Sequence, residues 1–122
     1  MKADQLFPYP VLPPDQQRVA DEAAGKVKAF ADAHIDHMRI DREARIPDAV
    51  VKGLADLGVY GMTIPPAFGG LGFGQRQYLK TMEVLGGHCA STAVLVNAHH
   101  SIGVRALVLF GTPEQQAKWL PG

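Results

Sequence analysis

Three groups of residues have types and spacings that could support chemistry, and the first is a glycine-rich loop. Residues 65–74 read PPAFGGLGFG, and the backbone amides of such a loop can cradle a phosphate where a helix begins. A dinucleotide site also needs a buried strand before the loop and an acidic residue at the end of the next strand. Here a short segment interrupted by Gly61 precedes the loop, and no second strand follows. The pattern therefore favours a structural turn over a phosphate site.

The second group consists of histidines and the single cysteine. His99 and His100 are adjacent, so on a helix their side chains point about 100° apart and chelate one metal ion poorly. Cys89 lies outside the usual metal spacing from them. A nucleophilic site with Cys89 or Ser91 as the nucleophile and His88 as the base would lack a nearby acid to orient that base. We predict no metal ligand and no catalytic residue, and we interpret the histidine pair as helix packing.

The third group is a charged stretch over residues 34–45, which we interpret as a solvated face. Across the 122 residues, 12 Lys and Arg balance 12 Asp and Glu, which argues against a nucleic-acid partner. One cysteine excludes an internal disulfide framework and fits a reducing compartment. The purest apolar runs fall short of the about 20 residues of a membrane span, and the first residues lack an apolar signal segment. We expect a cytoplasmic protein with no transmembrane segment.

The elements that would position these groups are helices. Apolar residues recur every three or four positions over residues 14–36, 47–57, 75–85 and 91–110, and a last helix follows residue 112. We predict an all-α fold, a small orthogonal bundle of about five helices. A proline-rich extended arm is expected over residues 1–14, and a glycine-rich loop over residues 58–74.

Several residues predict where the helices begin and end. Gly58 and the pair Gly86-Gly87 are expected to end helices, and Ser91 to begin one. The helix over residues 91–110 is expected to be interrupted near Gly103. Thr112 stands three residues before a glutamine, which is the spacing of a capping box. Residues 36–45 fit either a helix end or a loop.

The helix over residues 91–110 has apolar residues around nearly its whole circumference, from Ala93 to Phe110. A helix that is apolar on every side must be covered on every side. Four or five short helices can hardly enclose one of their own. The sequence therefore predicts a covering layer that these residues lack: another domain, another chain or a ligand.

Segments of the chain, in order, resemble the N-terminal domain of the acyl-CoA dehydrogenase family. Residues 57–73, LGVYGMTIPPAFGGLGF, are similar to the family's glycine-rich signature, and residues 78–85, which include Glu83, to its next helix. Residues 98–103, AHHSIG, and 107–121, LVLFGTPEQQAKWLP, resemble the end of that domain. The sequences of these motifs are most similar to those of the long-chain and very-long-chain branch, and residues 1–45 match the family only loosely.

The resemblance identifies residues 15–122 as this helical domain and implies a longer enzyme. A middle β-domain and a C-terminal helical domain would follow, hold FAD between them and supply a catalytic glutamate. The implied reaction is α,β-dehydrogenation of an acyl-CoA in fatty-acid β-oxidation, with electrons passing to an electron-transfer flavoprotein. A homo-oligomer is expected, and the chain alone is expected to be inactive. No catalytic or flavin-binding residue is transferred to this chain, and Glu83 is interpreted as structural.

The resemblance also places the floor of the acyl pocket on the helix near residues 91–102. The candidate substrate-binding residues are Val94, Leu95, Asn97 and Ala98. Small or apolar side chains there would leave room for an alkyl tail, and each buried methylene gains about 0.8 kcal/mol. The alternative interpretation of these positions is a plain interdomain core.

Two other functions remain open at this point. An acyl-CoA oxidase or a flavin monooxygenase of the same fold would differ in groups around the flavin, which these residues do not include. A stand-alone helical interaction module would be soluble and monodisperse despite its apolar helix, whereas a fragment of an enzyme would aggregate. Gel filtration separates these two outcomes.

Overall fold

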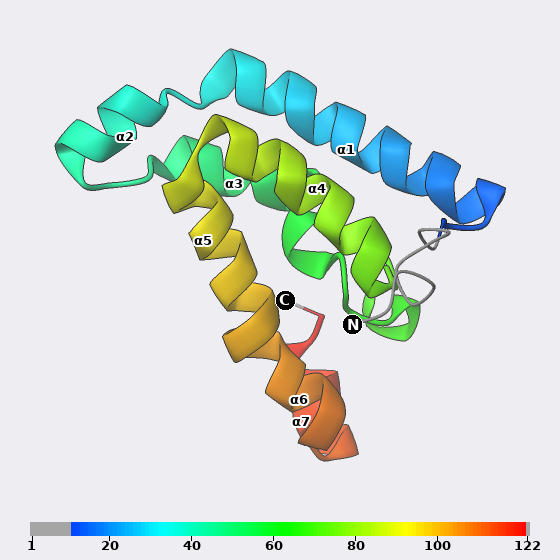
Figure 1. The fold of residues 1–122 in the computed structure, drawn as a ribbon. Coiled ribbons are helices and arrows are strands. Elements are labelled where there is room, and N and C mark those ends of the chain that lie inside the picture. The colour runs from blue at the N-terminus through cyan, green and yellow to red at the C-terminus, as the bar shows by residue number, and fades with distance from the viewer. Residues whose placement is uncertain (1–10, 122) are drawn as a thin grey trace, which may run out of the picture.

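The structure, a computed structural model, describes residues 11–121, and the regular elements there are all helical (Figure 1). In chain order they are α1 (Pro14–His34), α2 (His37–Glu43), α3 (Asp48–Asp56), the 3-10 turns η2 (Val59–Gly61) and η3 (Pro66–Phe68), α4 (Gln75–His88), α5 (Ala90–Ala98), the π-helical segment η4 (His99–Val104), α6 (Arg105–Phe110) and α7 (Pro113–Trp119). The all-α prediction is confirmed, since no strand occurs within residues 11–121. The predicted arm falls mostly on residues 1–10, which lie outside the described residues, and α1 already begins at Pro14.

Helices α1 and α4 lie side by side and form the most extensive helix pair among the described residues (Figure 1). The buried residues of α1 recur at spacings of three and four and are Ala20, Ala24, Val27 and Ala31. Because three of these four are alanines, the backbones of the two helices can approach closely. At the exposed edges of the pair, Lys80 contacts Asp21 and His88 contacts Asp32.

The hydrophobic core lies where α1, α3, α4, α5 and the loop after α3 meet. Its buried members are Val27, Val50, Leu54, Val59, Met62, Phe73, Tyr78, Leu85 and Val96. Helix α3 contributes Val50 and Leu54, which stand four residues apart and so share one face. Gly58 follows this helix with a φ of 74°, which confirms the predicted glycine cap.

The glycine-rich loop over residues 58–74 folds back on itself and covers one side of the core. Three of its amides donate to carbonyl groups of its own first half: Leu71 to Gly61 at 2.9 Å, Gly72 to Ile64 at 2.9 Å and Phe73 to Met62 at 2.7 Å. Gly72 has a φ of 63°, and a Cβ atom on Gly70 would lie 2.1 Å from the carbonyl oxygen of Ile64. Glycine is required at both positions, because one needs left-handed backbone and the other close backbone contact.

Several helix limits differ from the sequence-based prediction. Residues 36–45 contain a helix, α2, whose first turn is capped by Asp36: its Oδ1 accepts a hydrogen bond from the Arg39 amide at 3.0 Å. The prediction that Gly86-Gly87 ends a helix is wrong, because α4 continues to His88 and neither glycine has a positive φ. Ser91 does not begin α5; it lies inside the first turn, and Cys89 precedes the helix.

Helix α5, segment η4 and helix α6 form one continuous helix that leads away from the α1–α4 pair (Figure 1). The interruption expected near Gly103 takes the form of a π-helical segment rather than a break. At the far end α7 packs beside α6. Its start confirms the predicted capping box: the Thr112 hydroxyl accepts from the Gln115 amide at 3.3 Å, and the Gln115 side chain accepts from the Thr112 amide at 2.9 Å.

Candidate functional site

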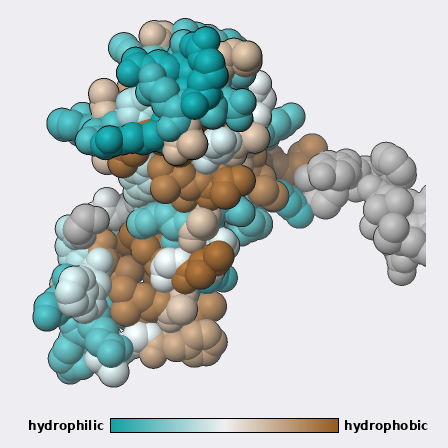
Figure 2. Space-filling view, turned by 90° about the vertical axis from the view of Figure 1, so that its left-hand side faces the viewer, coloured by the Kyte–Doolittle hydropathy of each residue, from teal (hydrophilic) through white to brown (hydrophobic). Residues whose placement is uncertain are grey.

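The continuous helix Ala90–Phe110 has one buried side and one broad exposed side. Thr92, Val96 and His100 recur every four residues and are buried against the core. The exposed apolar side chains are Val94 (65% exposed), Leu95 (36%), Ile102 (79%), Leu109 (53%) and Phe110 (84%). Figure 2 shows brown, apolar surface over the lower body of the molecule, where α5, α6 and α7 lie. The predicted uncovered apolar helix is present, and we call these five residues the apolar side.

The buried side is anchored by two histidines. His100 Nε2 donates to the Val59 carbonyl at 2.8 Å, and its Nδ1 accepts from the Thr63 hydroxyl at 2.8 Å. Burial lowers the pKa of His100, so the neutral ring fits both partners. His99 Nε2 donates to the Tyr60 carbonyl at 3.0 Å. No cluster of metal-ligating side chains occurs in the part of the chain that the structure describes, and the pair joins η4 to the loop as packing residues.

The four predicted substrate-binding residues occupy one helical turn but do not line one pocket. Val94 is exposed, and Ala98 is half-buried. Leu95 borders a hollow of about 530 Å³ beside α2. Asn97 borders a different, polar pocket of about 200 Å³, where its Oδ1 accepts from the Tyr78 hydroxyl at 2.9 Å. Ile102, the second most exposed member of the apolar side, was not among the predicted residues, although its separation of eight from Val94 could have indicated it.

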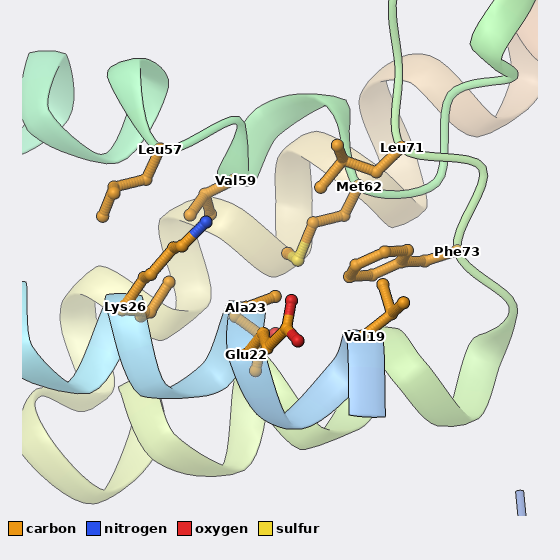
Figure 3. A pocket seen from close by; sticks show the side chains of 11 residues that line it. Val19, Glu22, Ala23, Lys26, Leu57, Val59, Met62, Leu71 and Phe73 are labelled. Atoms are coloured by element: carbon orange, nitrogen blue, oxygen red, sulfur yellow. The ribbon is translucent and has the colours of Figure 1, made fainter. Parts of the chain in front are cut away.

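A third pocket, of about 180 Å³, lies between α1 and the glycine-rich loop (Figure 3). Met62, Leu71 and Phe73 face it from the loop, and Glu22 and Lys26 extend over it from α1 (Figure 3). Sequence patterns did not indicate this pocket, because its two walls are more than 30 residues apart along the chain.

The glycine-rich loop does not fit the pyrophosphate of the FAD that the family resemblance implies. The glycine-rich loop is the natural candidate for the pyrophosphate of FAD, but its amides at residues 68–73 all donate to carbonyl groups of the same loop. An amide that is already bonded within the loop is not available to a phosphate oxygen. We therefore assign no flavin contact to this loop.

The same helix has a bearing on the prediction of no transmembrane segment. By length and composition alone, Ala90–Phe110 is long and apolar enough to cross a membrane, with 21 residues. This is weak evidence for a span, because a helix that other protein layers cover passes the same test. The helix also contains the buried and hydrogen-bonded His100 and the cation of Arg105, which a span of this kind seldom carries.

Comparison with known proteins identifies the family of this chain. Residues 14–122 match the family model described as acyl-CoA dehydrogenase, N-terminal domain. The very long-chain specific acyl-CoA dehydrogenase, mitochondrial, of Mus musculus is 37% identical over 97% of this chain and 18% of its own length, and that of Bos taurus 35% over 99% and 19%. "Probable acyl-CoA dehydrogenase FadE10" of Mycobacterium tuberculosis is 40% identical over 95% of this chain and 18% of its own length. The chain spans less than a fifth of these relatives, and it belongs to the acyl-CoA dehydrogenase family, as an N-terminal domain.

Proposed function

We propose that this domain forms one wall of an acyl-CoA binding site in a longer FAD-dependent enzyme. That enzyme would catalyse the α,β-dehydrogenation of acyl-CoA thioesters in fatty-acid β-oxidation and pass electrons to an electron-transfer flavoprotein. The observation that carries the proposal is the apolar side of Ala90–Phe110, where Val94 and Ile102 are 65% and 79% exposed. Exposed apolar area of this extent on a helix calls for a covering layer.

The role of this chain's residues is binding and the exclusion of water. An alkyl tail against Val94, Leu95 and Ala98 would gain about 0.8 kcal/mol for each methylene removed from water. FAD would supply the acceptor for the electrons, held by groups outside the described residues. Because the family resemblance transfers no catalytic base and no flavin contact to these residues, we expect the 122-residue chain to form no enoyl-CoA by itself.

The test uses the longest continuous reading frame that contains these residues. We expect Val94→Trp to narrow the acyl site, so that the ratio of kcat/KM for palmitoyl-CoA over butyryl-CoA falls by about tenfold. The matched control is Met38→Trp, an exposed apolar residue on α2 that should leave the ratio unchanged. An unchanged ratio in the Val94 variant would contradict the proposal.

The same assay separates the rival functions. Reduction of an electron-transfer flavoprotein supports the dehydrogenase, whereas consumption of oxygen with release of peroxide indicates an oxidase, and an oxygenated product a monooxygenase. If no reading frame extends these residues and the chain is monodisperse on gel filtration, the stand-alone interaction module is favoured instead.

A further inference from the structure

The pocket of about 200 Å³ beside Asn97 is lined by side chains that all carry a polar group: Thr63, Gln75, Tyr78, Asn97, His100, Ser101 and Arg105. It lies between the start of α4 and the helical segment from Asn97 to Arg105, and Tyr78 and His100 form its buried floor. No carboxylate lines it, and its single charged group is Arg105. Among residues 11–121 Arg105 makes no ion pair, whereas Arg18 and Arg39 both pair with a glutamate four residues away.

Some polar groups of the pocket have hydrogen-bond partners among the described residues, and others do not. On the floor, the Tyr78 hydroxyl donates to Asn97 Oδ1 at 2.9 Å, and the Thr63 hydroxyl to His100 Nδ1 at 2.8 Å. Ser101 Oγ donates to the Asn97 carbonyl at 2.7 Å. With Asn97 Oδ1 turned to the Tyr78 hydroxyl, Asn97 Nδ2 is a donor with no acceptor among the described residues.

Three donors at the rim therefore have no acceptor within residues 11–121: the Arg105 guanidinium, Asn97 Nδ2 and the side-chain amide of Gln75. Gln75 is also the first residue of α4, whose positive end favours an anion. The π-helical segment η4 supports the arrangement, because its wider turn helps to keep residues 97, 101 and 105 on one face of the helix. Such π-helical segments are frequently found at functional sites.

We propose that this pocket binds a carboxylate group, with the guanidinium of Arg105 as its main partner and the amides of Asn97 and Gln75 as further donors. One cation with neutral amides matches a monoanion, and the planar guanidinium donates two parallel hydrogen bonds to a carboxylate. A cavity of 150 Å³ holds a benzene molecule, so about 200 Å³ has room for a carboxylate and a few further heavy atoms. The proposal does not depend on the acyl-CoA role of the apolar side.

The experiment is an NMR titration of the ¹⁵N-labelled chain with sodium acetate against sodium chloride at equal ionic strength. We expect saturable shifts of the Arg105 Nε–H signal and of the Asn97 and Gln75 side-chain amides with acetate only. Arg105→Gln should weaken binding by about tenfold or more, and Arg105→Lys, which keeps the charge but loses the fork, by less. The matched control is Lys26→Gln, an exposed cation on α1 outside this pocket, which should bind acetate like the unchanged chain.

A second titration distinguishes the source of the carboxylate. A short capped peptide with one glutamate is compared with the same peptide carrying glutamine. If acetate binds as tightly as the glutamate peptide, the result supports a free acid as the ligand. If the glutamate peptide binds more tightly, the result supports an acidic side chain of a covering polypeptide. Three results would overturn the proposal. The first is shifts that stay linear with both ligands, and the second is binding by Arg105→Gln equal to that of the unchanged chain while its circular-dichroism spectrum is native. The third is tighter binding of inorganic phosphate than of acetate.

Discussion

His88 and His100 show how hydrogen-bond partners select the protonation state of a single residue. His88 Nε2 lies 2.6 Å from an Asp32 carboxylate oxygen, and its Nδ1 lies 3.1 Å from the Val84 carbonyl. Both partners are acceptors, so only the doubly protonated, charged ring satisfies them. His100 instead faces one carbonyl and one hydroxyl, and the neutral ring satisfies both. The two residues therefore respond to pH in opposite directions.

The hydrogen bond to Asp32, followed by that to Val84, raises the pKa of His88 above its ordinary value of about 6.5. A raised pKa in the folded state gives stability that is fully present below about pH 6.5 and is lost as pH rises through the folded value. We expect the difference in unfolding free energy between the unchanged chain and His88→Gln to be larger at pH 6 than at pH 9. Urea unfolding over this range measures it, and a difference that grows with pH would contradict the assignment.

For His100 the sign is reversed, because burial lowers its pKa in the folded state. The unfolded chain then binds the proton more readily, so this residue costs stability as pH falls below about 6.5. At neutral pH we expect His100→Ala to destabilise the fold by about 1–3 kcal/mol, since the Val59 carbonyl and the Thr63 hydroxyl both lose a partner. Thermal unfolding of His100→Ala beside Ser101→Ala, whose side chain is exposed, measures the cost.

At the scale of elements, the sequence correctly predicted the helix ends that depend on contacts between residues close together along the chain. Thr112 and Gln115 cap α7 through their own side chains, and Gly58 follows α3 with a positive φ, so both could be predicted. The end of α4 depends on contacts distant in sequence. His88, the last residue of α4, contacts Asp32 on α1, 56 residues away, after two glycines that the helix includes. No pattern within α4 carries that information.

For the candidate site, the sequence predicted the uncovered helix but not which of its residues share a pocket. The apolar circumference of residues 93–110 predicted an uncovered helix, and five of its large side chains are exposed. The sequence could not predict how the faces of α5 and α6 align, because the π-helical segment η4 lies between the two helices. Leu95 and Asn97 both lie on α5, ahead of η4, and two positions along an α-helix are about 200° apart, so these residues border different pockets.

A substitution of Gly87 tests the corrected end of α4. Gly87 lies inside the helix, and a Cβ atom there would meet nothing within 4 Å. We expect Gly87→Ala to stabilise the chain by about 0.4–1 kcal/mol, because alanine restricts the unfolded backbone more than glycine. The control is Gly72→Ala, where φ is 63° and Pro66 Cδ lies 2.9 Å from the added Cβ atom, so that destabilisation is expected. Urea unfolding that showed Gly87→Ala to be destabilising would instead support a helix ending at Gly86-Gly87.

At the scale of the whole molecule, the chain divides into a packed part and an uncovered part. The core is shared by α1, α3, α4, α5 and the loop, whereas α6 has no buried residue. At the far end Phe110 and Trp119 are 84% and 63% exposed. Apolar surface of this kind on a protein in water promotes association until a partner covers it. The stability of the packed part and the solubility of the uncovered part therefore depend on different residues.

This separation can be measured with the double variant Ile102→Lys and Phe110→Lys. Both side chains are exposed, so we expect the unfolding free energy to change by no more than about 0.5 kcal/mol. The two lysines should nevertheless raise the monomer fraction in sedimentation velocity at high protein concentration, because they interrupt the apolar side. Met38→Lys on α2, also an exposed apolar residue, is the control and should leave association unchanged. If Met38→Lys reduced association as strongly as the double variant, or if neither did, the apolar side would not be the surface that a partner covers.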